Sequence, residues 1–140
     1  MSDDTTPAGQ DQRAGERVEL RLPADSAYLA VLRTAAAGLA ARLDFTLDEI
    51  EDLRIAVDEA CALLLPRIAE GDGLTCVFTI EADTLGVEVS ARTTDADPPR
   101  RDSFAWTVLT ALAGEVDASA DGDGRVRITL RKRRGAVVGA

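Results

Sequence analysis

Alternation of apolar and polar residues marks the first predicted strand. Val18, Leu20 and Leu22 alternate with charged residues over residues 17–22, and Pro23 ends the run. Because successive side chains of a strand point to opposite faces, the pattern predicts a strand with one buried and one solvated face.

Four further segments have the character of strands. Residues 74–82 and 85–93 flank a turn and predict a hairpin. Residues 115–133 predict two strands on either side of a turn at 121–124. The positions of the last strand that are expected to face the core are Val126, Ile128 and Leu130.

Two helices are predicted from apolar residues at helical spacing on either side of the hairpin. The first begins at a cap formed by Asp25 or Ser26 and continues to about Leu43. Its apolar positions are Tyr28, Val31, Leu32, Ala35, Leu39 and Leu43. The other is a short helix in residues 103–113, which Gly114 ends.

Between them lies the helix that the sequence predicts most clearly. Thr46 and Glu49 have the spacing of a capping box, and Pro66 ends the apolar periodicity that follows. The stripe that should face the core consists of Ile50, Leu53, Val57, Ala60, Cys61 and Leu64.

The order of these elements is βααββαββ, which indicates the fold class. Strands that alternate cleanly have one wet face, so the helices should share the other face of a largely antiparallel sheet. We therefore expect an α/β (α+β) two-layer sandwich. Residues 17–132 should form the single domain, between a polar tail at 1–16 and a C-terminal tail at 133–140 that includes solvated basic residues.

Charge and composition limit the classes of partner and of metal site that the chain can have. The 140 residues carry a net charge of −9, which argues against nucleic acid or an anionic membrane surface and permits a basic protein partner. The chain has no histidine, and Cys61 and Cys76 fit no zinc motif, so we expect no metal site of the nitrogen or sulfur type. Both cysteines are interpreted as small core residues in a reducing cytoplasm, and no signal peptide or membrane-spanning run is apparent.

Two adjacent carboxylates, Asp58 and Glu59, interrupt the apolar sequence of the second helix. Asp58 follows Arg54 by four residues and is interpreted as a solvated partner of that arginine. Glu59 shares a second helix face with Ile55, Ala62 and Leu63. From the residues alone, Glu59 is either an ordinary exposed acid or part of a cleft in which a carboxylate acts chemically.

The order of elements and the sequence RLPADSAYLAVLRTAAAGLAARLDFTLDEIEDLRIAVDEACALLL resemble the RsbW/SpoIIAB family of anti-sigma factors and serine kinases. These are GHKL ATPases with the Bergerat fold. The similarity extends from about Arg17 to Arg131, and its strongest part is DLRIAVDEA. ATP and magnesium are the cofactors that the resemblance implies.

In the family, a Glu-x-x-x-Asn motif on this helix supplies a base and a magnesium ligand. Glu59 falls on the base position, but Leu63 falls on the position of the asparagine. A leucine has no oxygen to offer a hard cation, so one expected metal ligand is missing.

The other two nucleotide motifs of the family also depart from their pattern. The region of the adenine-binding acid reads TTDADPP, so Asp95 or Asp97 is the candidate, but the glycines that should follow are absent. Ser103 and Ala105 take the places of a Gly-x-Gly motif whose bare backbone approaches phosphate. We therefore expect ATP binding and phosphotransfer to be weak or absent.

The resemblance implies a homodimer that contacts a sigma factor through the first helix, where Arg33 matches a partner-contacting arginine. An acidic group at the start of the second helix suits the helix dipole and a basic sigma domain alike: Asp44, Asp48, Glu49, Glu51 and Asp52. The favoured hypothesis is an anti-sigma factor released by an anti-anti-sigma factor. The alternatives are an active kinase of that antagonist with Glu59 as base, and a pseudo-ATPase whose pocket binds another ligand.

Overall fold

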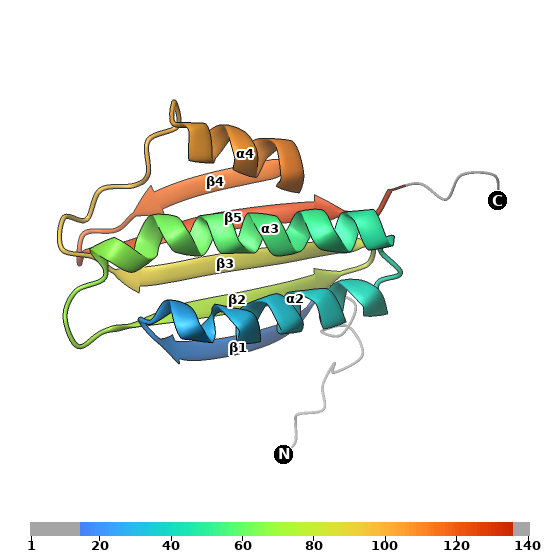
Figure 1. Cartoon of the computed structure of the whole chain (residues 1–140), viewed down its shortest axis with the longest axis horizontal. Coiled ribbons are helices and arrows are strands. Elements are labelled where there is room, and N and C mark those ends of the chain that lie inside the picture. The colour runs from blue at the N-terminus through green and yellow to red at the C-terminus, as the bar shows by residue number, and fades with distance from the viewer. Residues whose placement is uncertain (1–14, 136–140) are drawn as a thin grey trace, which may run out of the picture.

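A five-stranded antiparallel sheet forms one layer of the structure (Figure 1). The computed structural model describes residues 15–135. The strand order is β1-β2-β3-β5-β4, and each neighbouring pair is antiparallel, as predicted. The strands are β1 (Glu16–Pro23), β2 (Gly73–Glu81), β3 (Thr84–Arg92), β4 (Glu115–Ala120) and β5 (Arg125–Arg133).

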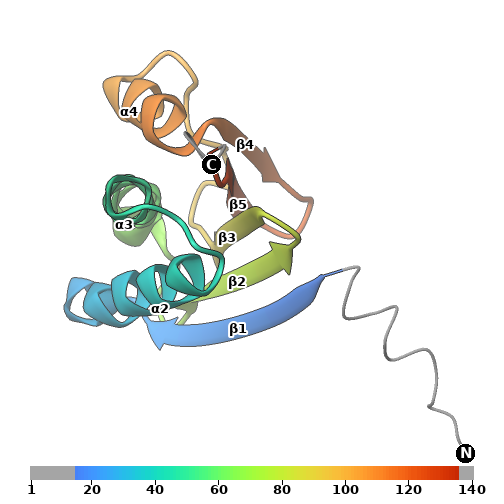
Figure 2. The same cartoon turned by 90° about the vertical axis from the view of Figure 1, so that its right-hand side faces the viewer.

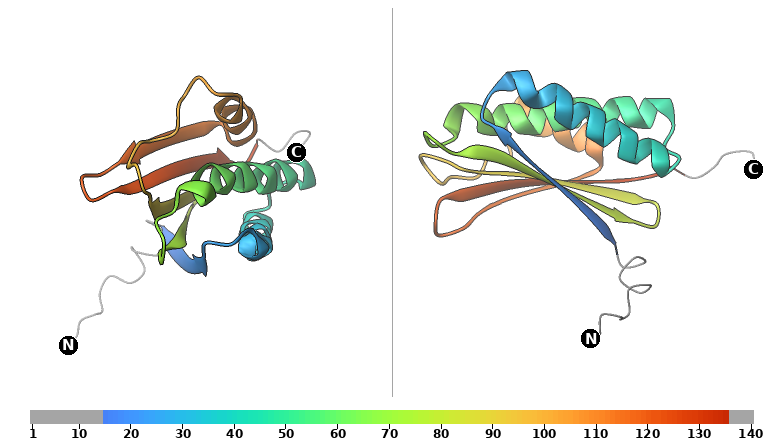
Figure 3. Two further views of the ribbon diagram at one scale, coloured as in Figure 1. Left: turned by 60° about the vertical axis from the view of Figure 1, so that its left-hand side comes forward. Right: turned by 90° about the horizontal axis from the view of Figure 1, so that it is seen from below.

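Three α-helices form the second layer, all on the same face of the sheet (Figures 2 and 3). They are α2 (Leu29–Arg42), α3 (Leu47–Leu64) and α4 (Phe104–Ala113), and the short 3₁₀ turns η2 (Ser26–Tyr28) and η3 (Leu65–Arg67) flank them. The middle position belongs to α3, with α2 on one side and α4 on the other. The predicted two-layer sandwich is confirmed.

Side-chain caps precede η2, α3 and α4, whereas α2 continues from η2 and has no side-chain cap of its own. The Asp25 carboxylate accepts from the Ala27 N–H before η2, which settles the choice between Asp25 and Ser26. Thr46 and Glu49 make both bonds of the capping box, at 3.1 and 2.8 Å. These caps satisfy amide groups that have no partner within the helix.

The core lies between the two layers and contains the predicted inward positions of α3 and β5. The first predicted helix is present as η2 and α2, and its buried residues are Leu32, Ala36 and Ala40. Of the apolar positions at helical spacing, Tyr28 and Val31 are 42% and 45% exposed. Since α2 lies near the edge strand β1, the sheet covers only a narrow stripe of this helix.

The ordered domain extends beyond the expected boundary at its C-terminal end. Arg133, expected in the C-terminal tail, is the last residue of β5. The Arg134 N–H donates to the Asp83 carbonyl, and the Gly135 N–H donates to Glu49 Oε2 at 2.7 Å. The rest of the predicted tails, residues 1–14 and 136–140, lies outside the described residues. Among residues 15–135, no helix has the length and apolar character to cross a bilayer.

Candidate functional site

Glu59 and Leu63 lie one turn apart on the flank of α3 that faces away from α2. Successive helix residues are rotated by about 100°, so Asp58, which contacts α2, is on the opposite flank from Leu63. Both Glu59 and Leu63 are half-buried. Leu63 packs at the margin of the core, and Glu59 makes no ion pair or side-chain hydrogen bond with any described residue. The structure thus presents the candidate base and a hydrocarbon side chain side by side.

Asp58 does not pair with Arg54 as expected. Its two carboxylate oxygens accept from Arg33 Nη1 at 3.0 and 2.9 Å, which joins α3 to α2. Arg54 instead pairs with Glu51, three residues earlier on α3. Residues 51, 54 and 58 lie within about 60° of one another around α3, so their side chains share one side of the helix. There Arg33 from α2 binds Asp58, and Arg54 binds Glu51.

Asp95 is held by a residue that the sequence analysis did not single out. Arg67 Nη2 donates to Asp95 Oδ1 at 2.5 Å and also to the backbone carbonyl of Asp97. The hydrogen bond from Arg67 is the main cause that lowers the pKa of the Asp95 carboxyl. Asp97 contributes its backbone to this cluster, and its N–H donates to Asp95 Oδ1 at 3.3 Å. No sequence spacing predicts the contact, since Arg67 and Asp95 are 28 residues apart.

Ser103 is the cap of α4. Its hydroxyl oxygen accepts from the Trp106 N–H at 3.1 Å, and the hydroxyl donates to the Arg100 carbonyl at 3.2 Å. Ala105 is half-buried in the first turn of the helix. One amide at the N-terminus of α4 is therefore already satisfied within the chain, and both positions carry a Cβ.

These positions do not match what a magnesium–nucleotide complex requires. Leu63 has no oxygen for the cation, Asp95 is bound by Arg67, and Ser103 bonds its own helix. Glu59, Leu63 and the loop that bears Asp95 lie toward the same end of the helix layer. The polar side chains of Asp95 and Ser103, however, already make hydrogen bonds to other groups of this chain.

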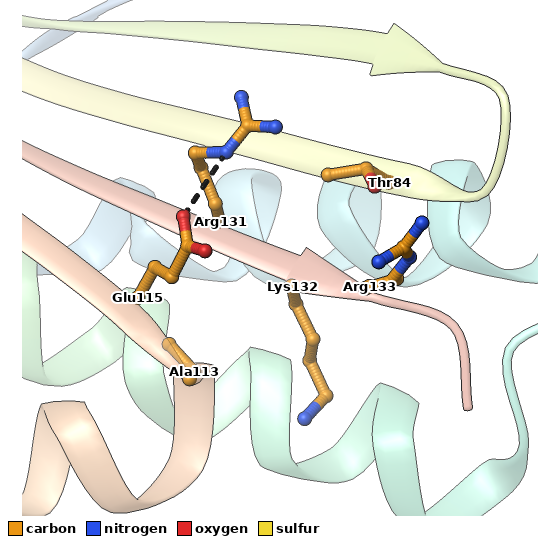
Figure 4. A pocket seen from close by; sticks show the side chains of 7 residues that line it. Thr84, Ala113, Glu115, Arg131, Lys132 and Arg133 are labelled. Carbon is orange, nitrogen blue, oxygen red and sulfur yellow. Dashed lines mark ion pairs between the residues drawn. The ribbon is translucent and has the colours of Figure 1, made fainter.

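A cavity of about 530 Å³ lies elsewhere, at the corner between the start of β4 and the end of β5 (Figure 4). Its basic side chains already have partners. Arg131 Nε lies 3.4 Å from Glu115 Oε1, and Lys132 Nζ donates to the Leu112 carbonyl at 2.9 Å. Figure 4 shows Lys132 and Arg131 pointing away from each other. The charged groups of Arg131 and Lys132 in this cavity are therefore already bound to other groups of the chain.

Comparison with known proteins gives the family. No family model matches the chain. The anti-sigma-F factor RsbW of Mycobacterium tuberculosis (strain ATCC 25618 / H37Rv) is 37% identical over 142 residues, which cover 97% of this chain and 84% of that protein. A serine-protein kinase RsbW of Bacillus mycoides (strain KBAB4) is 35% identical over 104 residues, which cover 73% of this chain and 60% of that protein.

A solved structure shares the fold. The crystal structure of the RsbU and RsbW domains of a Mycobacterium tuberculosis protein matches with a TM-score of 0.69 at 16% identity, covering 87% of this chain and 33% of that chain. The likeness supports the sandwich architecture, and the sequence similarity extends over almost the whole chain. The chain therefore belongs to the RsbW family, in which the two relatives compared above are named an anti-sigma-F factor and a serine-protein kinase.

Proposed function

We propose that the chain is an anti-sigma factor. It binds and sequesters an RNA polymerase sigma factor of the stress or developmental type, and an anti-anti-sigma factor releases that sigma factor. The observation that carries this proposal is the 37% identity, over 97% of the chain, with a protein named an anti-sigma-F factor. The net charge of −9 suits a basic protein partner better than direct contact with nucleic acid.

The surface of α2 next to β1 supports a protein-binding role. Tyr28 and Val31 are exposed there although both are large and apolar. Val31 lines a groove of about 480 Å³ together with Leu20, Ala30, Thr34 and Ala35. Exposed apolar area beside a groove is typical of interaction sites. We place the sigma contact, and the dimer contact that the family implies, on this side of the molecule.

Arg33 lies on the other flank of the same helix. Its Nη1 is engaged by Asp58, while a guanidinium carries five N–H donors. The remaining donors are available to acceptors on a partner. In this proposal Asp58 fixes the direction of the guanidinium, so Arg33 contributes to partner contact as an oriented group.

The second candidate function is a serine kinase that acts on the anti-anti-sigma factor. Glu59 favours it, because this carboxylate is partly exposed and makes no ion pair with a described residue. The name of the Bacillus mycoides relative also favours it, and a serine-protein kinase uses ATP. Against it stand Leu63, the Arg67–Asp95 pair and the self-capped Ser103. We therefore propose that ATP binding and phosphotransfer are weak or absent.

A binding titration with the sigma factors of the same genome tests the proposed function. We expect Val31→Glu to weaken the complex by about tenfold, because it places a charge in the apolar groove. The matched control is Phe104→Ala, which removes an 83% exposed apolar side chain from α4 and should change affinity by less than about twofold. Absence of a measurable complex with every sigma factor, or an equal loss in the two variants, would overturn the proposal.

A further inference from the structure

The loop between β3 and α4 is fastened to the end of α3. Besides the bonds from its side chain to Asp95 and to the Asp97 carbonyl, Arg67 accepts the Thr94 N–H at 2.9 Å through its own carbonyl. Ile68 forms an antiparallel bridge with Thr93. Side-chain and backbone contacts therefore join residues 67–68 to residues 93–97.

The loop is also folded upon itself around Asp95. The Ala96 N–H donates to Thr93 Oγ1 at 3.0 Å, and the Asp97 N–H donates to the Asp95 carboxylate. Ala96 has a φ of 58°, a left-handed conformation that is unfavourable for a residue with a Cβ. Such a conformation persists where the surroundings impose it, and here those surroundings centre on Arg67.

Arg67 itself is incompletely satisfied. Its Nε is the single buried side-chain nitrogen or oxygen in residues 15–135 that has no hydrogen-bond partner. An arginine in solvent would have water at every donor, so the buried Nε opposes this placement. Arg67 keeps this position because its Nη2 donates to Asp95 and to the Asp97 carbonyl.

We propose that Arg67 holds the loop of residues 93–97 closed against the end of α3 without any ligand, because its guanidinium binds the Asp95 carboxylate. Asp95 Oδ1 already accepts from the Arg67 guanidinium at 2.5 Å and from the Asp97 N–H at 3.3 Å, so the amino group of a base would compete with both donors for this oxygen. Arg67 thereby disfavours the binding of a nucleotide base at Asp95. The inference goes beyond the anti-sigma assignment and does not depend on which partner binds.

The chain contains a matched control within the same loop. Arg100 pairs with Asp102 at 2.7 Å, but both side chains are largely exposed and two residues apart. Breaking that pair removes an arginine–aspartate contact of similar geometry without disconnecting the loop from α3. An effect that is specific to Arg67 therefore cannot come from the loss of surface charge alone.

Hydrogen exchange of the full chain, without a partner, tests the proposal. We expect Arg67→Ala and Asp95→Asn each to speed exchange of the amides in residues 94–97 by about tenfold, since each breaks the same ion pair. Arg67→Lys should lie between these variants and the wild type, because lysine keeps the charge but lacks the planar fork. Arg100→Ala should stay within about twofold of the wild type.

Magnesium–ATP at millimolar concentration is the ligand probe. We expect it to leave the exchange of residues 94–97 unchanged in the wild type. If Arg67→Ala fails to fold, Asp95→Asn still tests the proposal, because it keeps Arg67. Exchange of residues 94–97 in Asp95→Asn within about twofold of the wild type would overturn the proposal that Arg67 holds this loop closed. Protection of the wild-type loop by Mg–ATP would overturn the inference that Arg67 disfavours a nucleotide at Asp95. Both measurements, the exchange of residues 94–97 and its response to Mg–ATP, are made without a sigma factor. Failure to find a sigma complex would therefore not change either result.

Discussion

The ion pair between Arg33 and Asp58 gives a prediction with a definite size. Replacing Asp58 by alanine should lower the free energy of unfolding, because Arg33 Nη1 loses both carboxylate oxygens at 3.0 and 2.9 Å. Two unit charges about 4 Å apart attract by about 4 kcal/mol at an effective dielectric constant of 20 and by about 1 kcal/mol in water. The side chains are 34% and 36% exposed, so solvent screens much of this attraction and the net coupling should be about 1 kcal/mol.

A double-mutant cycle measures this coupling. The cycle compares Arg33→Ala, Asp58→Ala and the double variant by urea unfolding, followed through the fluorescence of the single tryptophan, Trp106, which is 7% exposed. A parallel cycle of Arg54→Ala with Asp58→Ala should give no coupling. At about 1 M salt the Arg33–Asp58 coupling should fall by about half. A coupling below about 0.3 kcal/mol, or one equal to that of the Arg54 cycle, would refute the assignment of the pair.

Three further outcomes follow from local contacts. Ser103→Ala should lower the unfolding free energy by about 1 kcal/mol in urea, and Ser103→Gly by less, because the cap of α4 is lost. The side chain of Asp123, followed by the Arg127 guanidinium and the Arg125 N–H that donate to the Asp121 carboxylate, lowers the pKa of Asp121 from 3.8 to about 2. Its carboxylate therefore stabilises the fold above about pH 4, and this contribution is lost as the pH falls through about 2. Between about pH 4 and pH 2, the free energy of unfolding should therefore fall less in Asp121→Asn than in the wild type. An equal fall in the two proteins would contradict this. Burial raises the pKa of the Cys61 thiol to about 12 and that of Cys76 higher still, so iodoacetamide at neutral pH should modify neither until urea unfolds the chain, as mass spectrometry would show.

Much of the fold follows from local patterns in the sequence. The capping box at Thr46 and Glu49 and the alternation of Val126, Ile128 and Leu130 each depend on neighbouring residues, and the structure reproduces them. The surface of α2 shows where periodicity stops being sufficient. This helix is apolar on most sides, so the pattern cannot say which side the sheet covers, and Tyr28 of the periodic set is exposed.

The contacts that define the candidate site depend on packing between distant segments. Arg33 and Asp58 are 25 residues apart, and Arg67 and Asp95 are 28 apart. Only the placement of α2 beside α3, and of the β3–α4 loop beside η3, brings these charges together. For Asp58 the sequence offered a nearby arginine four residues away, and the tertiary contact outcompeted it.

The central claim is that the chain captures a sigma factor without the help of a nucleotide. Calorimetric titration of the chain with the sigma factors of its genome, with and without Mg–ATP, tests this most directly. The account predicts a complex whose Kd differs by less than about threefold between the two conditions. A complex that forms only with Mg–ATP, together with transfer of labelled phosphate to the antagonist that Glu59→Ala abolishes, would contradict it.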